Sequence, residues 1–280
     1  MTEVRHIRTA RDGAVGIITI HRPERFNSLD VRTAQDLRKA GLGFARDEEV
    51  RCVVLRGVPG VFCSGADLKY VRERRHPEDL GYLQPESVPV EEGYGANFKQ
   101  ILEYLHSTIS EIKRAPKPFV AAVDGIAAAG GFGLAMACDL VFASDRASFE
   151  WAYGKTGLTG AESSTFFLPR LVGLRKALEL VFLNPRLSAE EARDLGLVNA
   201  VFPADRFDEE VLAIARGLAA GPTRAYGIAK RLVHEAAGAS LLDEHLDTEL
   251  RHLAEIAETE DFAEGLRAFF EKREAKFRGA

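Results

Sequence analysis

The chain has 280 residues, of which 46% are hydrophobic and 28% charged, and its formal net charge is −5. This composition is typical of one large globular domain or of a core with an appendage, and without a long basic run it gives no reason to expect a nucleic-acid partner. No apolar run reaches the roughly 18–20 residues that span a bilayer, and no leader opens the chain. We therefore expect a cytoplasmic protein without a membrane partner.

The three cysteines, Cys52, Cys63 and Cys138, all lie in apolar stretches of the sequence. Their odd number and their spacing fit no metal site, so they predict buried free thiols in a reducing compartment and no bound metal. No electropositive partner is evident for any of them, which argues against a catalytic thiol.

The first third of the chain alternates between strand and helix patterns. Residues 4–20 alternate as two strands with a turn at Asp12-Gly13. After a loop, helical periodicity over residues 29–45 leads to an apolar run at residues 50–56, which is typical of a strand buried on both faces. A glycine-bearing turn at residues 61–69 then enters a helix.

A long loop and a second helix follow. Residues 76–95 are rich in proline, glycine and acids, which is typical of a lid or a disordered loop. Residues 96–114 return to helical spacing.

The most informative stretch is residues 118–138. An apolar strand-like segment ends in the small residues Ala129, Gly130 and Gly131, and a buried helix is expected from Leu134. Small residues let a ligand approach the backbone, and a helix start offers free N–H groups that could hold an oxygen gaining negative charge. Close helix–strand packing is the commoner reason for a lone Gly-Gly pair.

The remainder of the chain becomes helical. Short strands are expected at residues 139–143, 147–151 and 198–202, with a short helix at residues 163–172 between them. Ser188 and the acid three residues after it form a capping-box pattern. Beyond residue 208 only helices are expected, so the pattern predicts an α/β core over residues 1–205 and a helical region over residues 206–280.

Five segments in their order and spacing together resemble the crotonase (enoyl-CoA hydratase/isomerase) superfamily. They are residues 21–29, 62–68, 118–139, 168–173 and 189–198. The resemblance implies a crotonase/ClpP-like spiral of ββα units, with a C-terminal helical region used in homotrimers or dimers of trimers. It also implies acyl-CoA substrates, with coenzyme A as part of the substrate and no permanently bound cofactor.

The resemblance assigns an oxyanion hole to the backbone N–H groups of Ala66 and Gly130. Two such donors stabilise an enolate-like thioester oxygen, and losing one typically costs about 3–4 kcal/mol of transition-state stabilisation. The residues that match the family's coenzyme A pocket are Arg25, Phe26, Ala66, Asp67 and Leu68. Arg25 could instead be a solvated loop charge.

The sequence departs from the hydratases at both of their catalytic glutamates, whose positions are occupied here by Gly133 and Tyr153. An ordinary two-glutamate hydratase is therefore not expected. Other branches place one acid just before the helix at residues 163–172, where Ala161 is followed by Glu162. Glu162 is the candidate base, because a dry acyl pocket would raise its pKa toward the working range. It could instead only support the helix N-terminus.

The predicted acyl pocket includes Tyr153, as proton donor or wall, with Trp151, Phe132 and His106. A buried tyrosine and a packed histidine are the simpler interpretations of the first and the last. Three acids of the long loop could supply a missing carboxylate from a lid: Glu86, Glu91 and Glu92.

Residues 149–172 also resemble the 4-chlorobenzoyl-CoA dehalogenase branch. Its aryl-pocket tryptophan matches Tyr153, but its nucleophilic aspartate matches Ala161 and its helix histidine matches Ser110. Without that aspartate, dehalogenation through an aspartyl ester is disfavoured.

The preferred hypothesis is an isomerase-type proton transfer on a thioester-stabilised enolate, because it needs only one base. An acyl-CoA hydratase, hydrolase or carbon–carbon lyase that uses a bound water is the alternative. A third hypothesis, from a different class, is an acyl-CoA-binding homologue without turnover.

Overall fold

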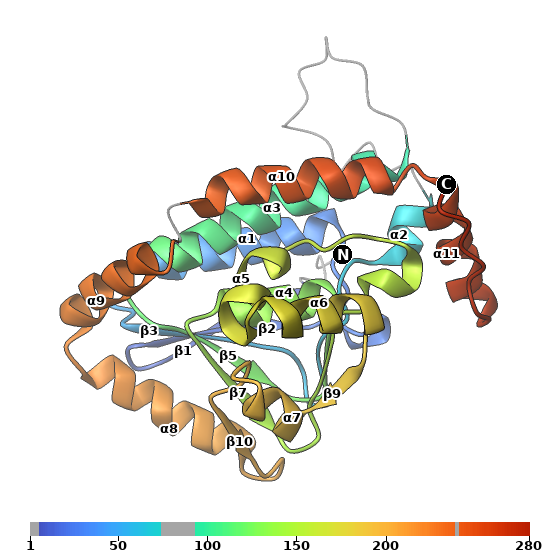
Figure 1. Ribbon diagram of the computed structural model, residues 1–280. Coiled ribbons are helices and arrows are strands. Elements are labelled where there is room, and N and C mark those ends of the chain that lie inside the picture. The colour runs from blue at the N-terminus through green and yellow to red at the C-terminus, as the bar shows by residue number, and fades with distance from the viewer. Residues whose placement is uncertain (1–5, 74–92, 239–240) are drawn as a thin grey trace, which may run out of the picture.

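The computed structural model describes residues 6–73, 93–238 and 241–280 (Figure 1). Two sheets form its centre. The larger has the order β1 (Ile7–Asp12), β2 (Val15–Ile20), β3 (Cys52–Arg56), β5 (Phe119–Val123), β7 (Leu140–Ser144) and β10 (Ala200–Phe202). The smaller has the order β4 (Val61–Cys63), β6 (Ile126–Ala128), β8 (Ser148–Glu150) and β9 (Arg186–Ser188). Neighbouring strands are parallel except for the antiparallel pairs β1–β2 and β8–β9.

From β3 to β8, successive strands alternate between the two sheets, and a helix follows each pair. β3 is followed by β4 and α2 (Leu68–Glu73), and β5 by β6 and α4 (Gly130–Ala137). β7 is followed by β8, the 3-10 turn η3 (Tyr153–Thr156) and α5 (Ser164–Val172). This repeated ββα pattern confirms the predicted fold class.

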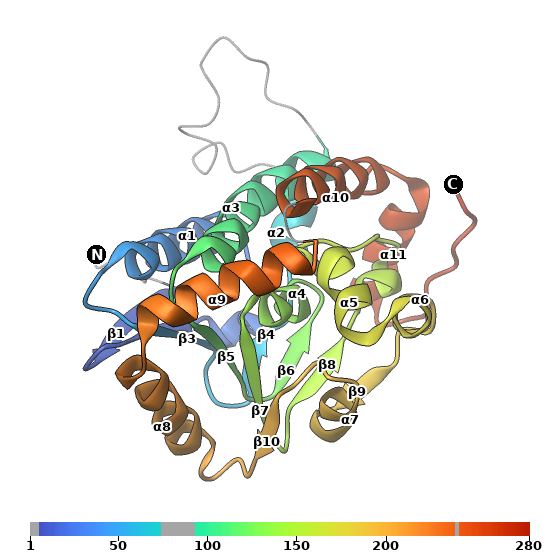
Figure 2. The same cartoon turned by 60° about the vertical axis from the view of Figure 1, so that its left-hand side comes forward.

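The remaining helices cover the sheets. α1 (Val31–Arg46), α3 (Tyr94–Arg114) and α10 (Leu242–Ile256) lie side by side above the larger sheet, and α8 (Phe207–Ala220) lies on its opposite side (Figures 1 and 2). The other helical elements are η1 (Pro23–Arg25), α6 (Leu174–Leu183), α7 (Ala189–Asp194), α9 (Thr223–Ala236) and α11 (Glu260–Glu271). The predicted boundary at residues 205 and 206 falls between β10 and α8; it stays a prediction.

β3 is buried on both faces, as its apolar run predicts. Val53 and Leu55 join the apolar core shared with α1, α3 and α4, whereas Cys52 and Val54 join the core under α8. Helices on both faces of a parallel sheet leave its central strands no solvent side. The three cysteines are free and buried, and burial raises the pKa of each thiol to about 12.

Two element boundaries differ from the sequence prediction, and both lie at glycines. The apolar run at residues 118–129 splits into β5 and β6 at Asp124 and Gly125, because Gly125 has a φ of +83°. The Asp124 carboxylate holds that corner by accepting from the Ser144 hydroxyl at 2.6 Å and the Gly60 amide at 3.0 Å. α4 begins at Gly130 and not at Leu134, so its glycines lie inside the helix.

Two further sequence predictions concern a cap and a membrane. Ser188 and Glu191 form the predicted capping box at the start of α7. Over the part of the chain that the structure describes, no helix is both long and apolar enough to cross a membrane. The expected compartment stays a prediction.

Candidate active site

A buried arginine joins the loop after β2 to the turn after β4. The Arg22 guanidinium lies 2.8 Å from the Asp30 carboxylate and 2.9 Å from that of Asp67. The Asn27 side chain accepts from the Arg22 amide at 2.7 Å and donates to the Val61 carbonyl at 2.9 Å. Because these groups are buried and paired, the two loops are held as one unit.

The residues predicted to line the coenzyme A pocket lie on this unit. Phe26 is in the left-handed region at a φ of 52°, and its side chain is 63% exposed. The Arg25 guanidinium lies 3.6 Å from the Asp67 carboxylate. Asp67 is buried and caps α2 by accepting from the Lys69 amide at 3.0 Å, and Leu68 opens that helix. Arg25 and Phe26 are thus accessible, whereas the Asp67 side chain serves the scaffold.

The two glycine turns lie backbone against backbone. A Cβ atom at Gly65 would be 3.0 Å from the Gly130 amide nitrogen, and one at Gly131 would overlap the Cys63 carbonyl. Ala66 therefore lies beside the start of α4, where the first amides have no partner within the helix. Within the described residues, neither the Ala66 nor the Gly130 amide donates a hydrogen bond. This arrangement offers two backbone donors from adjacent turns, as an oxyanion hole requires.

Glu162 fills the space that two glycines of α4 leave open. Its side chain is buried, and a Cβ atom at Gly130 would lie 2.9 Å from its carboxylate oxygen. A Cβ atom at Gly133 would lie 2.7 Å from the Glu162 carbonyl oxygen and 2.8 Å from its Cβ. The side chain therefore reaches the candidate oxyanion hole only because residues 130 and 133 have no side chains.

Tyr153 is the direct hydrogen-bond partner of the Glu162 carboxyl. Its hydroxyl can donate to that carboxyl and lies 3.1 Å from the Ala161 carbonyl oxygen. Burial raises the pKa of Glu162 to about 7; the Tyr153 hydrogen bond acts in the opposite direction, and the negative charge of Glu249 acts in the same direction. Burial also raises the pKa of Tyr153 well above its ordinary value, so its hydroxyl stays protonated. Near neutral pH, Glu162 can both accept and return a proton.

The predicted pocket residues divide into two groups. Trp151 packs edge-on against Tyr153 with ring centroids 5.1 Å apart, and Phe132 is buried on α4 between its glycines. His106 lies instead on α3, with its ring 3.8 Å from the Glu249 carboxylate. Burial lowers the pKa of His106 to about 4. The structure thus gathers Gly130, Tyr153, Trp151 and Glu162, and places His106 beside Glu249. The predicted site roles stay predictions.

Glu162 does not cap α5, contrary to the simpler interpretation of its position. Glu162 and Ser163 have φ values of 50° and 60°, and α5 begins at Ser164. The acceptor of the Ser163 and Thr165 amides is Glu249 of α10, at 2.9 and 3.0 Å. Sequence reasoning missed this residue. Its signal was a carboxylate on the apolar face of a helix, at four-three-four spacing with Leu242, Leu246 and Leu253.

Two further sequence predictions concern carboxylates from the long loop and a bound metal. The acids of the long loop, Glu86, Glu91 and Glu92, lie outside the described residues. Residues 6–73, 93–238 and 241–280 contain no group of three or more His, Cys, Asp or Glu side chains that could hold a metal ion.

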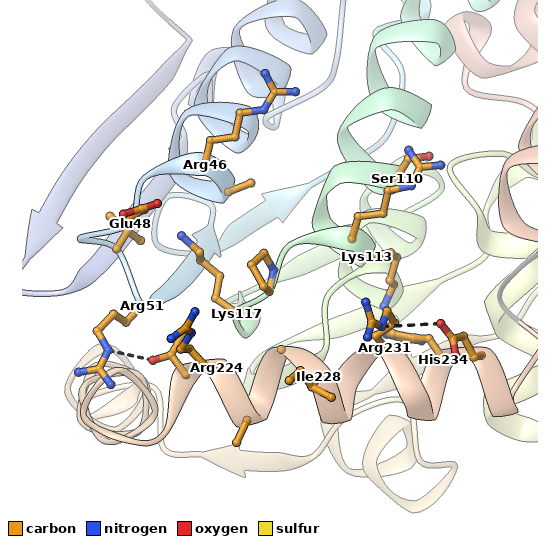
Figure 3. Close-up of a pocket in the computed structure, with 18 of the residues that line it drawn as sticks. Arg46, Glu48, Arg51, Ser110, Lys113, Lys117, Arg224, Ile228, Arg231 and His234 are labelled. Atoms are coloured by element: carbon orange, nitrogen blue, oxygen red, sulfur yellow. Dashed lines mark hydrogen bonds and ion pairs between the residues drawn. The ribbon is translucent and has the colours of Figure 1, made fainter.

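A separate cavity of about 1690 Å³ lies between the C-terminal ends of α1 and α3 and helix α9 (Figure 3). Basic side chains such as Arg51 and Lys117 line it, but the Lys117 ammonium donates to the Phe44 carbonyl at 3.0 Å and Arg51 donates to the Thr223 hydroxyl at 2.8 Å. No residue predicted for the site lines this cavity, so the glycine turns and Glu162 remain the candidate site.

Comparison with known proteins points to one family. The family model described as "Enoyl-CoA hydratase/isomerase" matches residues 10–280. The chain is 33% identical over 267 residues to 4-chlorobenzoyl coenzyme A dehalogenase-2 of an Arthrobacter species, covering 95% of this chain and 91% of the relative. It is 31% identical over 262 residues to 1,2-epoxyphenylacetyl-CoA isomerase of Escherichia coli, covering 94% of each. An enoyl-CoA hydratase structure from Mycobacterium avium subsp. paratuberculosis superposes with a TM-score of 0.84 at 30% identity, over 99% of this chain and 100% of the other.

The fit between Gly133 and Glu162 predicts an unusual response to alanine. Gly133→Ala should destabilise the protein by about 1–3 kcal/mol, because the added methyl group overlaps Glu162. Gly217→Ala in α8 is the matched control, since nothing lies within 4 Å of its added Cβ; it should stabilise the protein by up to about 1 kcal/mol. Urea unfolding measures the stability of both variants. If Gly133→Ala stabilised the protein as much as Gly217→Ala, a side chain at residue 133 would not clash with Glu162.

Proposed function

The chain belongs to the enoyl-CoA hydratase/isomerase family and acts on acyl-CoA, and from that premise we propose that it shifts a proton next to the thioester carbonyl. Glu162 is the base, and the Ala66 and Gly130 amides hold the thioester oxygen. The observation that carries the proposal is the buried Glu162 carboxyl against Gly130, at the start of α4.

The proposed reaction balances with a single carboxylate. Ionised Glu162 removes a proton from carbon, and the electron pair moves into the thioester to give an enolate whose oxygen accepts from both amides. Neutral Glu162 then returns the proton to a different carbon, which shifts the double bond and restores the base. A carboxyl group whose pKa is about 7 suits both steps near neutral pH.

Hydration with two carboxylates is less well supported by these side chains. Gly133 has no side chain, and Tyr153 keeps its proton because burial raises its pKa. Activation of a bound water by Glu162 alone, in hydration, hydrolysis or carbon–carbon cleavage, is the alternative, as is binding without turnover. Dehalogenation through an aspartyl ester is not proposed, despite the Arthrobacter relatives, because Ala161 stands at the matching position.

We propose an aromatic or other cyclic acyl group as the substrate class. The edge-on pair of Trp151 and Tyr153 gives the site an aromatic wall beside Glu162. The names of two relatives, a 4-chlorobenzoyl-CoA dehalogenase and a 1,2-epoxyphenylacetyl-CoA isomerase, support the same class. Arg25 and Phe26 would contact coenzyme A at the entrance, where Phe26 is 63% exposed.

We also propose a homotrimer or a dimer of trimers. α6 exposes Leu174, Leu178 and Phe182 at four-residue spacing, which forms one apolar face. α9 exposes Ile228 and Leu232 in the same way, and Ile228 also lines the cavity of Figure 3. Contiguous exposed apolar faces of this kind mark protein–protein interfaces.

Glu162→Gln tests the base. With aryl-substituted enoyl- and dienoyl-CoA substrates, it should slow turnover and solvent deuterium incorporation into the acyl group by about 10²–10⁴-fold. Chromatographic separation of the double-bond isomers follows turnover, and mass spectrometry follows deuterium incorporation. A product heavier by one water identifies the hydration alternative. Glu209→Gln, which changes an exposed glutamate on α8, is the control. Deuterium incorporation at the wild-type rate in Glu162→Gln would remove Glu162 from the mechanism.

The pH profile tests the link between Tyr153 and Glu162. For the wild type, kcat/KM should rise with pH through about 7, because the ionised carboxylate is the active form. Tyr153→Phe removes a hydrogen bond that favours the anion, so this midpoint should move to higher pH. A midpoint that stays in place would mean that the hydroxyl does not stabilise ionised Glu162.

Phe182→Asp tests the oligomer. A carboxylate in the proposed interface should shift the protein to smaller species in size-exclusion chromatography with light scattering, because its burial is costly. Ala213→Asp adds the same charge at an exposed position of α8 and should leave the mass unchanged. A Phe182→Asp protein with the mass of the wild type would place the interface elsewhere.

A further inference from the structure

One carboxylate of the C-terminal helices is buried next to the active-site turn. Glu249 lies on the face of α10 that buries Leu246 and Leu253, and its side chain is only 3% exposed. A buried carboxylate needs hydrogen-bond donors, and those of Glu249 come from α5.

Both oxygens of Glu249 bind the first amides of α5. Oε2 accepts from the Ser163 amide at 2.9 Å, and Oε1 accepts from the Thr165 amide at 3.0 Å and from the Thr165 hydroxyl. The N-cap residue Ser163 makes no side-chain capping bond of its own. Glu249 therefore supplies, from α10, the cap that α5 lacks locally.

The capped segment is the one that aims Glu162. Glu162 and Ser163 both have positive φ values, a conformation that costs free energy for residues with side chains. Such a turn persists only where surrounding contacts determine it, and Glu249 holds it from the far side through the Ser163 amide.

We propose that Glu249 is a positioning residue: it fixes the Glu162–Ser163 turn through the α5 amides, so that the C-terminal helix α10 is part of the active site. The inference rests on the proposed role of Glu162 as base. It assigns to Glu249 no contact with substrate.

The charges around Glu162 give the inference a distinct electrostatic signature. The negative charge of Glu249 raises the pKa of Glu162, whereas Tyr153 of η3 lowers it by hydrogen bonding. Cys63 of β4, whose pKa burial raises to about 12, stays neutral, as does His106 of α3, whose pKa burial lowers to about 4. The His245 ring of α10 lies 2.7 Å from the Thr165 hydroxyl and 3.6 Å from Glu249.

Glu249→Gln tests the proposal, because it keeps the shape of the side chain but loses the charge and puts an N–H group against one α5 amide. We expect kcat to fall about tenfold or more, since small misplacements of a catalytic group are costly. KM should change less than about twofold, because Glu249 does not touch substrate, whereas the loss reflects the transition state. The midpoint of kcat/KM against pH should move below about 7, opposite to Tyr153→Phe.

Three comparisons make the test specific. Glu255→Gln removes a charge from an exposed position of the same helix, with a side chain 77% exposed, and should match the wild type. Thr165→Val removes one hydroxyl contact but keeps the Glu249 charge, so its pH midpoint should stay in place. Glu249→Asp keeps the negative charge, so the midpoint of its kcat/KM profile should return toward that of the wild type. A variant that was only partly folded would lose activity without such a return of the midpoint.

The outcomes separate this inference from the proposed function. If Glu162→Gln abolishes deuterium incorporation while Glu249→Gln keeps the wild-type kcat and pH midpoint, only the role of Glu249 is overturned. If Glu162→Gln retains wild-type incorporation, the base and its positioning residue are overturned together. A Glu249→Gln protein with lower kcat, unchanged KM and a lower midpoint supports the proposal.

Discussion

Burial of the Glu162 carboxyl is the interaction on which the site depends. A carboxylate removed from water is unstable unless its neighbours donate hydrogen bonds or its pKa rises, and here Tyr153 donates while burial raises the pKa to about 7. The volume that it occupies exists only because Gly130 and Gly133 have no side chains. The two glycines lower the intrinsic stability of helix α4, but they leave the space in which the Glu162 carboxyl is buried beside the candidate oxyanion hole.

The backbone donors depend on a second constraint, the contact between the two glycine turns. Because Gly65 and Gly131 have no side chains, the turns after β4 and β6 pack closely against each other. The Arg22 guanidinium, shared by Asp30 and Asp67, then fixes the turn after β4 to the loop after β2. Donors held in this way need no rearrangement when charge develops on an oxygen, which is the source of their effect in catalysis.

Much of the fold could be predicted because the strands and most helices show their own periodicity, and the order of five short motifs indicated the family. The prediction failed where contacts distant in sequence decide. Helix α4 begins at Gly130 although glycine has a low helix propensity, and its second residue, Gly131, packs against the backbone of Cys63. The sequence around residue 130 does not reveal this contact. The cap of α5 comes from Glu249, more than eighty residues away, and no pattern near Ser163 announces it. Glu162 could be chosen from its place in the family pattern, but its burial and its bond to Tyr153 required the structure.

These contacts connect the turn that carries Glu162, the proposed base, to the C-terminal helix α10. A side chain at residue 133 would occupy the place of Glu162, so the site accommodates an acid from α4 or from the turn before α5, but not both in their present positions. An acid on a helix is oriented by the helix itself. An acid on a turn of two left-handed residues needs an external restraint, and the described contacts provide it through Glu249 of α10. In the proposed mechanism, a carboxyl on the turn and not on the helix therefore makes the site dependent on α10, which lies outside the ββα core.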